Sequence, residues 1–115
     1  MMEFQKKYSF DSRKSESQKI LQKHSDRLPV IVSNNPKEFY LDKHKYLVPR
    51  DLTMSQLIYV LRRRIKLEPS KAIFMFTNKT LIPTNSNIWQ IYDKYVDKDG
   101  FLYIEIKGEN TFGKK

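Results

Sequence analysis

The spacing of hydrophobic residues in the middle of the chain predicts a helix. Apolar side chains recur at intervals of three and four residues, as on one face of an α-helix, at Met54, Leu57, Ile58, Leu61 and Ile65. Thr53 and Gln56 have the spacing of a capping box, which marks where a helix begins. Pro69 sets the end, because proline cannot continue a helix. We therefore expect an amphipathic helix over residues 54–66.

Four other segments have the pattern of strands. Residues 27–32 are apolar after Arg27, and residues 72–76 are a continuous apolar run, whereas residues 44–49 and 101–107 alternate between apolar and polar positions. Pro49 suits a strand end or a sheet edge, because proline cannot donate a ladder hydrogen bond. In the last strand, one face is shared by Leu102, Ile104 and Ile106.

The remaining segments complete the predicted architecture. Residues 1–26 have a sparse apolar stripe typical of one or two short docked helices, and residues 88–95 predict a short amphipathic helix. Turn composition marks Ser33–Pro36 and Asp97–Gly100. This order predicts an α+β fold of the ubiquitin-like β-grasp type, with a mixed four-stranded sheet wrapped over one crossing helix. We expect three regions: a helical extension (1–26), the β-grasp core (27–107) and a flexible tail (108–115).

Composition narrows the functional classes. The 115 residues suffice for one core. The absence of cysteine excludes disulfides, thiolate metal sites and a cysteine nucleophile, and agrees with a reducing cytosol. No apolar run exceeds five residues, too few to span a membrane, and the N-terminus has no apolar stretch typical of a secretory signal. The net charge of +9 lies mostly in the first two-thirds of the chain and favours acidic peptides, phosphates or anionic lipids as partners.

Seven blocks of sequence resemble, in the same order, the ubiquitin-like autophagy modifiers: the GABARAP and light-chain-three proteins and their fungal and protist relatives. The blocks are Arg27–Ile31, Lys45–Pro49, Asp51–Thr53, Tyr59–Ile65, Lys71–Phe74, Asp97–Tyr103 and Gly108–Gly113. Several blocks in register are far more specific than any one of them. The resemblance implies an autophagy modifier, not an enzyme, that is cytoplasmic and becomes associated with autophagosomes or related vesicles.

The resemblance also implies a reactive C-terminus. Gly113 resembles the residue that a cysteine protease exposes and that activating-like and conjugating-like enzymes then join to phosphatidylethanolamine. Lys114 and Lys115 would be the removed tail, and Phe112 resembles the residue on the recognition side of the protease. Glycine suits such transfers because it has no Cβ to obstruct attack. No cofactor or metal is implied.

The resemblance implies, thirdly, a surface that binds peptides. Family members bind receptors through short motifs, an aromatic and an aliphatic residue separated by two others, usually beside acidic residues. Such a peptide would add to the edge of strand 44–49. A first pocket, for the aromatic residue, would be lined by Glu16, Ile20, Pro29, Ile31, Lys45, Leu47 and Phe101. A second, for the aliphatic residue, would be lined by Tyr46, Val48, Pro49, Leu52, Leu57, Val60 and Arg64. The acidic flanks would meet Arg27, Lys45 and Arg64.

Parts of this face also have plainer interpretations. Several pocket aliphatics, Val60 among them, fit the core equally well, and Arg62 and Arg63 suit a solvated helix face. Leu57 stands where many relatives carry phenylalanine, and the link from Ser33 to His44 is shorter than in familiar members. Preference among motifs therefore stays open.

Two other functions stay open as well. A basic domain with exposed aromatics could bind RNA, because Phe101 and Tyr103 share one strand face, as a stacking platform requires. The other is an unconjugated ubiquitin-like scaffold on cytoskeleton or membrane. The turn at Asp97–Gly100 lacks the later carboxylate of a calcium loop, and His24 and His44 have no carboxylate-rich motif beside them. We therefore predict neither a metal site nor an enzyme.

Overall fold

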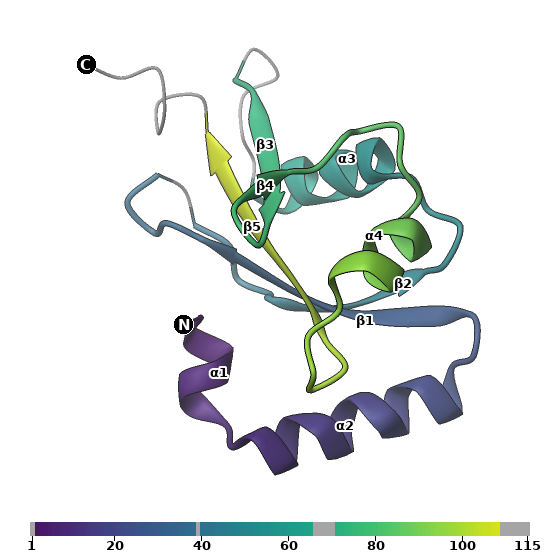
Figure 1. Ribbon diagram of the computed structural model, residues 1–115. Helices are drawn as coiled ribbons and strands as arrows, with labels where there is room; N and C mark the ends of the chain where they lie inside the picture. Colours follow the sequence, from purple (N-terminus) through teal and green to yellow (C-terminus); the bar gives the residue numbers. More distant parts are fainter. Residues whose placement is uncertain (1, 39, 66–70, 109–115) are drawn as a thin grey trace.

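The computed structural model describes residues 2–38, 40–65 and 71–108. Along these segments the elements follow one another in the order α1 (Glu3–Lys7), α2 (Phe10–Lys23), β1 (Arg27–Asn34), β2 (Lys45–Pro49), α3 (Met54–Ile65), β3 (Ile73–Thr77), β4 (Thr80–Leu81), α4 (Ile88–Tyr95) and β5 (Leu102–Gly108) (Figure 1). Among the described residues, no helix is long and apolar enough to cross a membrane.

The strands form one mixed sheet in the order β2-β1-β5-β3-β4. β1 and β5 are parallel, and the other neighbours are antiparallel. Helices α3 and α4 cover one face of the sheet, and α1 and α2 lie on the other (Figure 1). The predicted α+β arrangement, a mixed sheet with a helix packed across it, is confirmed, with one strand more than expected. The extra strand, β4, has two residues, too few to leave an alternating pattern in the sequence.

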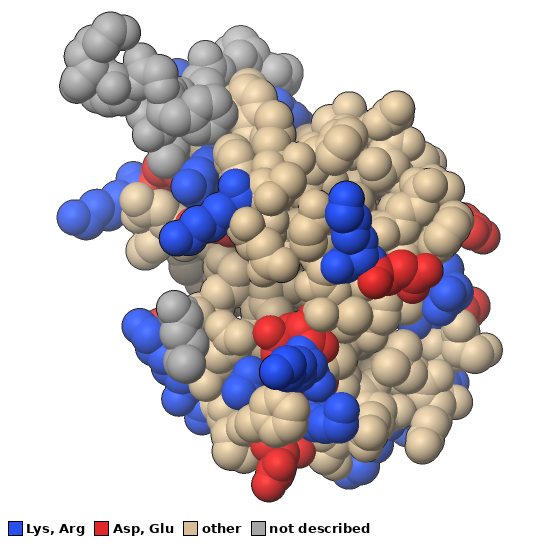
Figure 2. All heavy atoms as spheres, viewed as in Figure 1, with Lys and Arg blue, Asp and Glu red and all other residues tan. Residues whose placement is uncertain are grey.

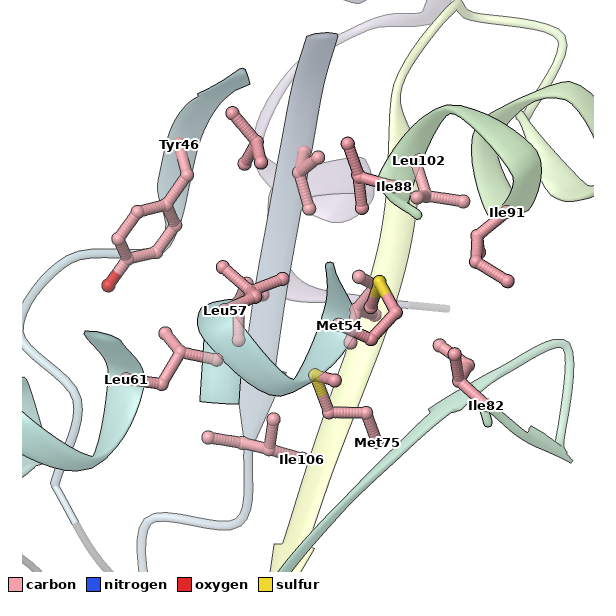
Figure 3. Close-up of a cluster of buried hydrophobic side chains, with 14 of the residues drawn as sticks. Tyr46, Met54, Leu57, Leu61, Met75, Ile82, Ile88, Ile91, Leu102 and Ile106 are labelled. Atoms are coloured by element: carbon pink, nitrogen blue, oxygen red, sulfur yellow. The ribbon is translucent and has the colours of Figure 1, made fainter. Parts of the chain in front are cut away.

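The main core fills the space between the sheet and helices α3 and α4 (Figure 3). β5 contributes the three residues predicted to share a face, each fully buried: Leu102, Ile104 and Ile106. From α3, Met54, Leu57 and Leu61 pack against them. The predicted capping box is present, since the Thr53 amide donates to Gln56 Oε1 (2.8 Å) and the Gln56 amide to Thr53 Oγ1 (3.2 Å).

One local prediction was wrong. Ser33 and Asn34 continue β1 rather than beginning a turn, and they pair with Glu105 and Ile106 of β5. The reason is tertiary: a parallel neighbour of seven residues extends β1 past the point where its own residue types favour a turn. Pro49 agrees with the prediction, because it ends the edge strand β2.

A smaller apolar cluster lies beneath the N-terminal helices. Ile31, Phe101 and Tyr103 are buried there against Phe4 and other partly buried residues. The rings of Phe4 and Phe101 meet edge to face, with centroids 5.1 Å apart. Phe101 is fully buried and Tyr103 is 9% exposed, so this pair does not offer the stacking platform on which the RNA-binding hypothesis rested.

Candidate functional site

Helix α2 is fastened to the β-grasp core by polar contacts. Arg13 donates to the fully buried Asp99 carboxylate, with Nη1 and Oδ2 2.7 Å apart. Tyr103 donates its hydroxyl to the same oxygen (2.5 Å), and the Phe101 amide donates to Oδ1 (2.9 Å). A buried carboxylate is stable only when its charge and lone pairs are matched in this way. The network therefore fixes α2, and with it Glu16 and Ile20, relative to the sheet.

The turn before β5 has the conformation that this attachment needs. Gly100 has a φ of +89°, and a Cβ there would overlap Ser17 Oγ. Ser17 in turn donates to the Asp99 carbonyl (2.6 Å). The prediction that Asp97–Gly100 is a turn is confirmed, and glycine is required in it both for its positive φ and for the close approach of α2.

A hollow between α2 and β2 brings together part of the predicted first pocket. We call it the α2–β2 hollow, and it is lined by Glu16, Ile20, His24, Arg27, Lys43, Lys45 and Leu47. Four of the predicted lining residues therefore meet there. The other three, Pro29, Ile31 and Phe101, are buried in the strand and cluster beneath it. Sequence reasoning missed His24 and Lys43, although Lys43 lies two residues before Lys45 and shares its charge.

The α2–β2 hollow is electropositive. Its wall carries Arg27, Lys43 and Lys45 against one acidic residue, Glu16, which is ion-paired with Lys45. Arg27 also donates to the Leu47 carbonyl (3.2 Å), which holds its guanidinium at the rim. Basic side chains are frequent over α1 and α2 in Figure 2, whereas the region of β4 and the following loop is largely uncharged. Such a field favours acidic ligands at the hollow.

The residues of the predicted second pocket divide between core and surface. Tyr46, Val48 and Leu57 are buried, and Leu52 is half-buried against the same core. Pro49, Val60 and Arg64 are exposed. The period of α3 points Leu57 inward and turns Val60 toward the flank. Arg64 lies two turns after Leu57 on nearly the same face and is exposed in the last turn of the helix. Arg64 forms an ion pair with Asp42, in which Nη2 and Oδ1 are 3.0 Å apart.

A second hollow adjoins the first. It lies between α1 and the segment that joins β1 to β2, its apolar wall includes Phe4, Tyr8 and Leu41, and it shares Lys45 with the α2–β2 hollow. The edge strand β2 therefore runs beside two hollows, and no other strand among the described residues pairs with its outer edge. An extended peptide lying on this edge would have hydrogen-bonding groups along its backbone and hollows for its side chains.

The predicted conjugation site lies outside the described residues. Phe112, Gly113, Lys114 and Lys115 all follow Gly108, the last described residue of β5. The Gly108 amide donates to the Glu38 carboxylate at 3.3–3.4 Å. Within the described segments no group of histidine and acidic residues could hold a metal ion.

Comparison with known proteins identifies the family. A family model described as "Autophagy protein Atg8 ubiquitin like" matches residues 12–113. The chain belongs to the Atg8 family. Autophagy-related protein 8 of Candida glabrata is 52% identical over 112 residues, which cover 96% of this chain and 95% of that protein. Its counterpart in Neurospora crassa is 51% identical over 112 residues, with 96% and 93% covered.

Solved Atg8 structures agree with this membership. The crystal structure of Trypanosoma brucei ATG8 has a TM-score of 0.90 and 40% identity, covering 95% of this chain and 96% of that one. Plasmodium falciparum Atg8, solved in complex with a P. falciparum Atg3 peptide, has a TM-score of 0.83 and 27% identity, with 93% and 96% covered. The resemblance inferred from the sequence blocks is therefore confirmed. As an Atg8 protein, the chain is a ubiquitin-like protein of autophagy and not an enzyme.

Proposed function

We propose that this chain is a conjugated autophagy modifier that captures receptors on the edge of β2. A protease removes Lys114 and Lys115, and activating-like and conjugating-like enzymes then join Gly113 to phosphatidylethanolamine. The lipid moves the protein from the cytoplasm to the autophagosome or a related vesicle, where it binds aromatic-x-x-aliphatic motifs. The observation that carries the docking part of the proposal is the electropositive α2–β2 hollow beside the outer edge of β2, with which no strand in the described part of the chain pairs.

The energetics of docking favour a reversible interaction. Burying an aromatic side chain of about 150–250 Å² contributes roughly 4–6 kcal/mol at ~25 cal/mol per Å². Ordering a disordered peptide takes back about 2–5 kcal/mol. One aromatic anchor, one aliphatic anchor and a few hydrogen bonds therefore give a dissociation constant on the order of micromolar. The acidic flanks of the motif would meet Arg27, Lys45 and Arg64, so affinity should weaken as salt rises.

The docking part is tested by titrating a Trp-x-x-Leu peptide with acidic residues before the tryptophan. Leu47 is half-buried at the hollow, and we expect Leu47→Ala to weaken binding about tenfold, equivalent to roughly 1.4 kcal/mol of lost apolar contact. Leu81→Ala is the matched control, because Leu81 is 54% exposed on β4 at the opposite edge of the sheet. Equal affinities of the two variants would place the peptide elsewhere.

The conjugation part is tested by intact mass spectrometry of protein recovered from its own cells. Two features support it: the match to the Atg8 family runs to residue 113, and a relative was solved with a peptide of Atg3, a conjugating-type enzyme. We expect a species that ends at Gly113 and carries a phospholipid, and we expect Gly113→Ala to keep the fold but lose both processing and lipid. Unimpaired lipidation of that variant would refute the assignment. Persistence of Lys114 and Lys115 on the mature protein would favour the unconjugated scaffold instead.

A further inference from the structure

The hydroxyl of Tyr46 is buried but forms no hydrogen bond within the described part of the chain. The side chain is 8% exposed, and its hydroxyl has no hydrogen-bond partner among the described residues. By contrast, the hydroxyl of Tyr92 donates to the Gly100 carbonyl (2.6 Å), and that of Tyr103 donates to Asp99. Buried hydroxyls are normally paired, because an unsatisfied one loses its hydration without compensation. The Tyr46 hydroxyl is therefore able to donate a hydrogen bond to an acceptor on a bound molecule.

The surroundings of this hydroxyl show what it could bind. The Tyr46 ring lies at the edge of the core cluster, and its hydroxyl points away from the centre of that cluster (Figure 3). Burial raises the pKa of Tyr46, while nearby Arg64 lowers it and Asp42 raises it, so both members of the exposed ion pair act on the hydroxyl. Arg64 is close to the hydroxyl, but a guanidinium can only donate, so the proton of the hydroxyl has no acceptor among the described residues. Lys43 Nζ lies 5.1 Å from the ring centroid, over the face of the ring.

The ion pair beside Tyr46 is open to exchange. The side chains of Arg64 and Asp42 are 37% and 53% exposed, and one Asp42 oxygen contacts one guanidinium nitrogen. An exposed pair of this kind is held weakly. A carboxylate has two oxygens and about four lone-pair sites, so one carboxylate can accept from a guanidinium and a hydroxyl together. Asp42 accepts a hydrogen bond from the Arg64 guanidinium but none from the Tyr46 hydroxyl.

We propose that Arg64 and the Tyr46 hydroxyl form a two-donor site for an acidic residue of the docked peptide, and that Asp42 occupies this site as an internal competitor. The inference rests on the proposed docking function and adds to it the identity of the competitor and of the second donor. The occupant is a peptide carboxylate because both Arg64 and Lys43, which lie beside Tyr46, are cationic. Binding exchanges Asp42 for the peptide's acid and gives the tyrosine hydroxyl its partner.

The test compares matched peptides on matched variants by calorimetric titration. The peptides share a Trp-x-x-Leu core, and one of the three residues after the leucine is either glutamate or glutamine. We expect Asp42→Asn to tighten binding of the best glutamate peptide about two- to fivefold, the usual effect of an exposed ion pair, with little change for its glutamine counterpart. Asp93→Asn, an exposed acid on α4, controls for the added net charge and should affect both peptides equally.

A second variant separates binding from folding. Tyr46→Phe removes only the unpaired hydroxyl, so the thermal midpoint should stay level or rise. The same variant should reduce the preference for the glutamate peptide over the glutamine peptide about two- to fivefold. A purely structural role for the hydroxyl would move both peptides together or neither.

The outcomes are distinguishable. If neither peptide binds the wild-type protein, the docking function and this inference fail together. If both bind and neither Asp42→Asn nor Tyr46→Phe changes the preference for glutamate, the two-donor site is refuted while docking stands. If Asp42→Asn weakens the glutamate peptide, Asp42 supports binding and is not a competitor.

Discussion

Two arginine–aspartate pairs of similar geometry lie in opposite environments in this protein. Arg13 and Asp99 are 2.7 Å apart with side chains 10% and 0% exposed, whereas Arg64 and Asp42 are 3.0 Å apart and 37% and 53% exposed. The buried carboxylate also accepts from Tyr103 and from the Phe101 amide, so each of its oxygens is used. The exposed carboxylate has water as an alternative partner. The same two residue types therefore make a structural attachment in one place and an exchangeable contact in the other, and burial decides which.

The comparison is tested most strongly at the buried pair. Asp99→Asn keeps the shape of the side chain but leaves the buried Arg13 guanidinium without an opposite charge. We expect it to lower the free energy of unfolding by about 3–5 kcal/mol, measured by urea denaturation. Peptide binding at the α2–β2 hollow should weaken as well, because α2 then loses its attachment.

The exposed pair supplies the matched control for that experiment. Asp42→Asn makes the same chemical change to the other pair, and its urea midpoint should stay close to that of the wild type. If the two variants lost equal stability, burial would not be what distinguishes the pairs.

A smaller, pH-dependent effect is expected at Tyr103. Burial, reinforced by the hydrogen bond to Asp99, holds the pKa of Tyr103 well above its ordinary value of about 10. The folded protein thus keeps this proton after the unfolded chain has released it, so the contribution is complete below about pH 10 and is lost as pH rises further. Tyr103→Phe should be less stable by about 1.5–3 kcal/mol at pH 8, because it lacks the bond to the carboxylate. Its deficit should shrink between pH 10 and 11 in urea titrations, whereas parallel curves would contradict this account.

Much of the fold could be predicted because its signals are local. The period of α3, its capping box and the alternation of β5 all lie within single elements, and each is present as expected. The failures came where a neighbour decides the outcome. Ser33 and Asn34 are strand because β5 pairs with them, and β4 exists because two residues pair with the end of β3.

Part of the candidate site could be predicted from the resemblance to the family. Glu16, Ile20, Lys45 and Leu47 were placed on one face by resemblance, and they do line one hollow. The period of α3 places Leu57 on its apolar stripe and Val60 beside it, but the sequence alone did not show which of the two lies in the core and which lies at the surface beside β2. His24 and Lys43 joined the hollow through the packing of α2 on β2, which residue types alone do not reveal.

The sequence by itself determined the order of the elements other than β4, the inward faces of α3 and β5, and the resemblance to the family, because these depend on residue type and spacing along the chain. Only the tertiary structure decided that Arg13 meets Asp99, 86 residues away, that the Tyr46 hydroxyl has no partner among the described residues, and that Asp42 lies against Arg64. The spacing of apolar residues along the sequence indicates which face of its own helix or strand a side chain occupies. What it meets there, and whether water reaches it, depends on the element packed opposite.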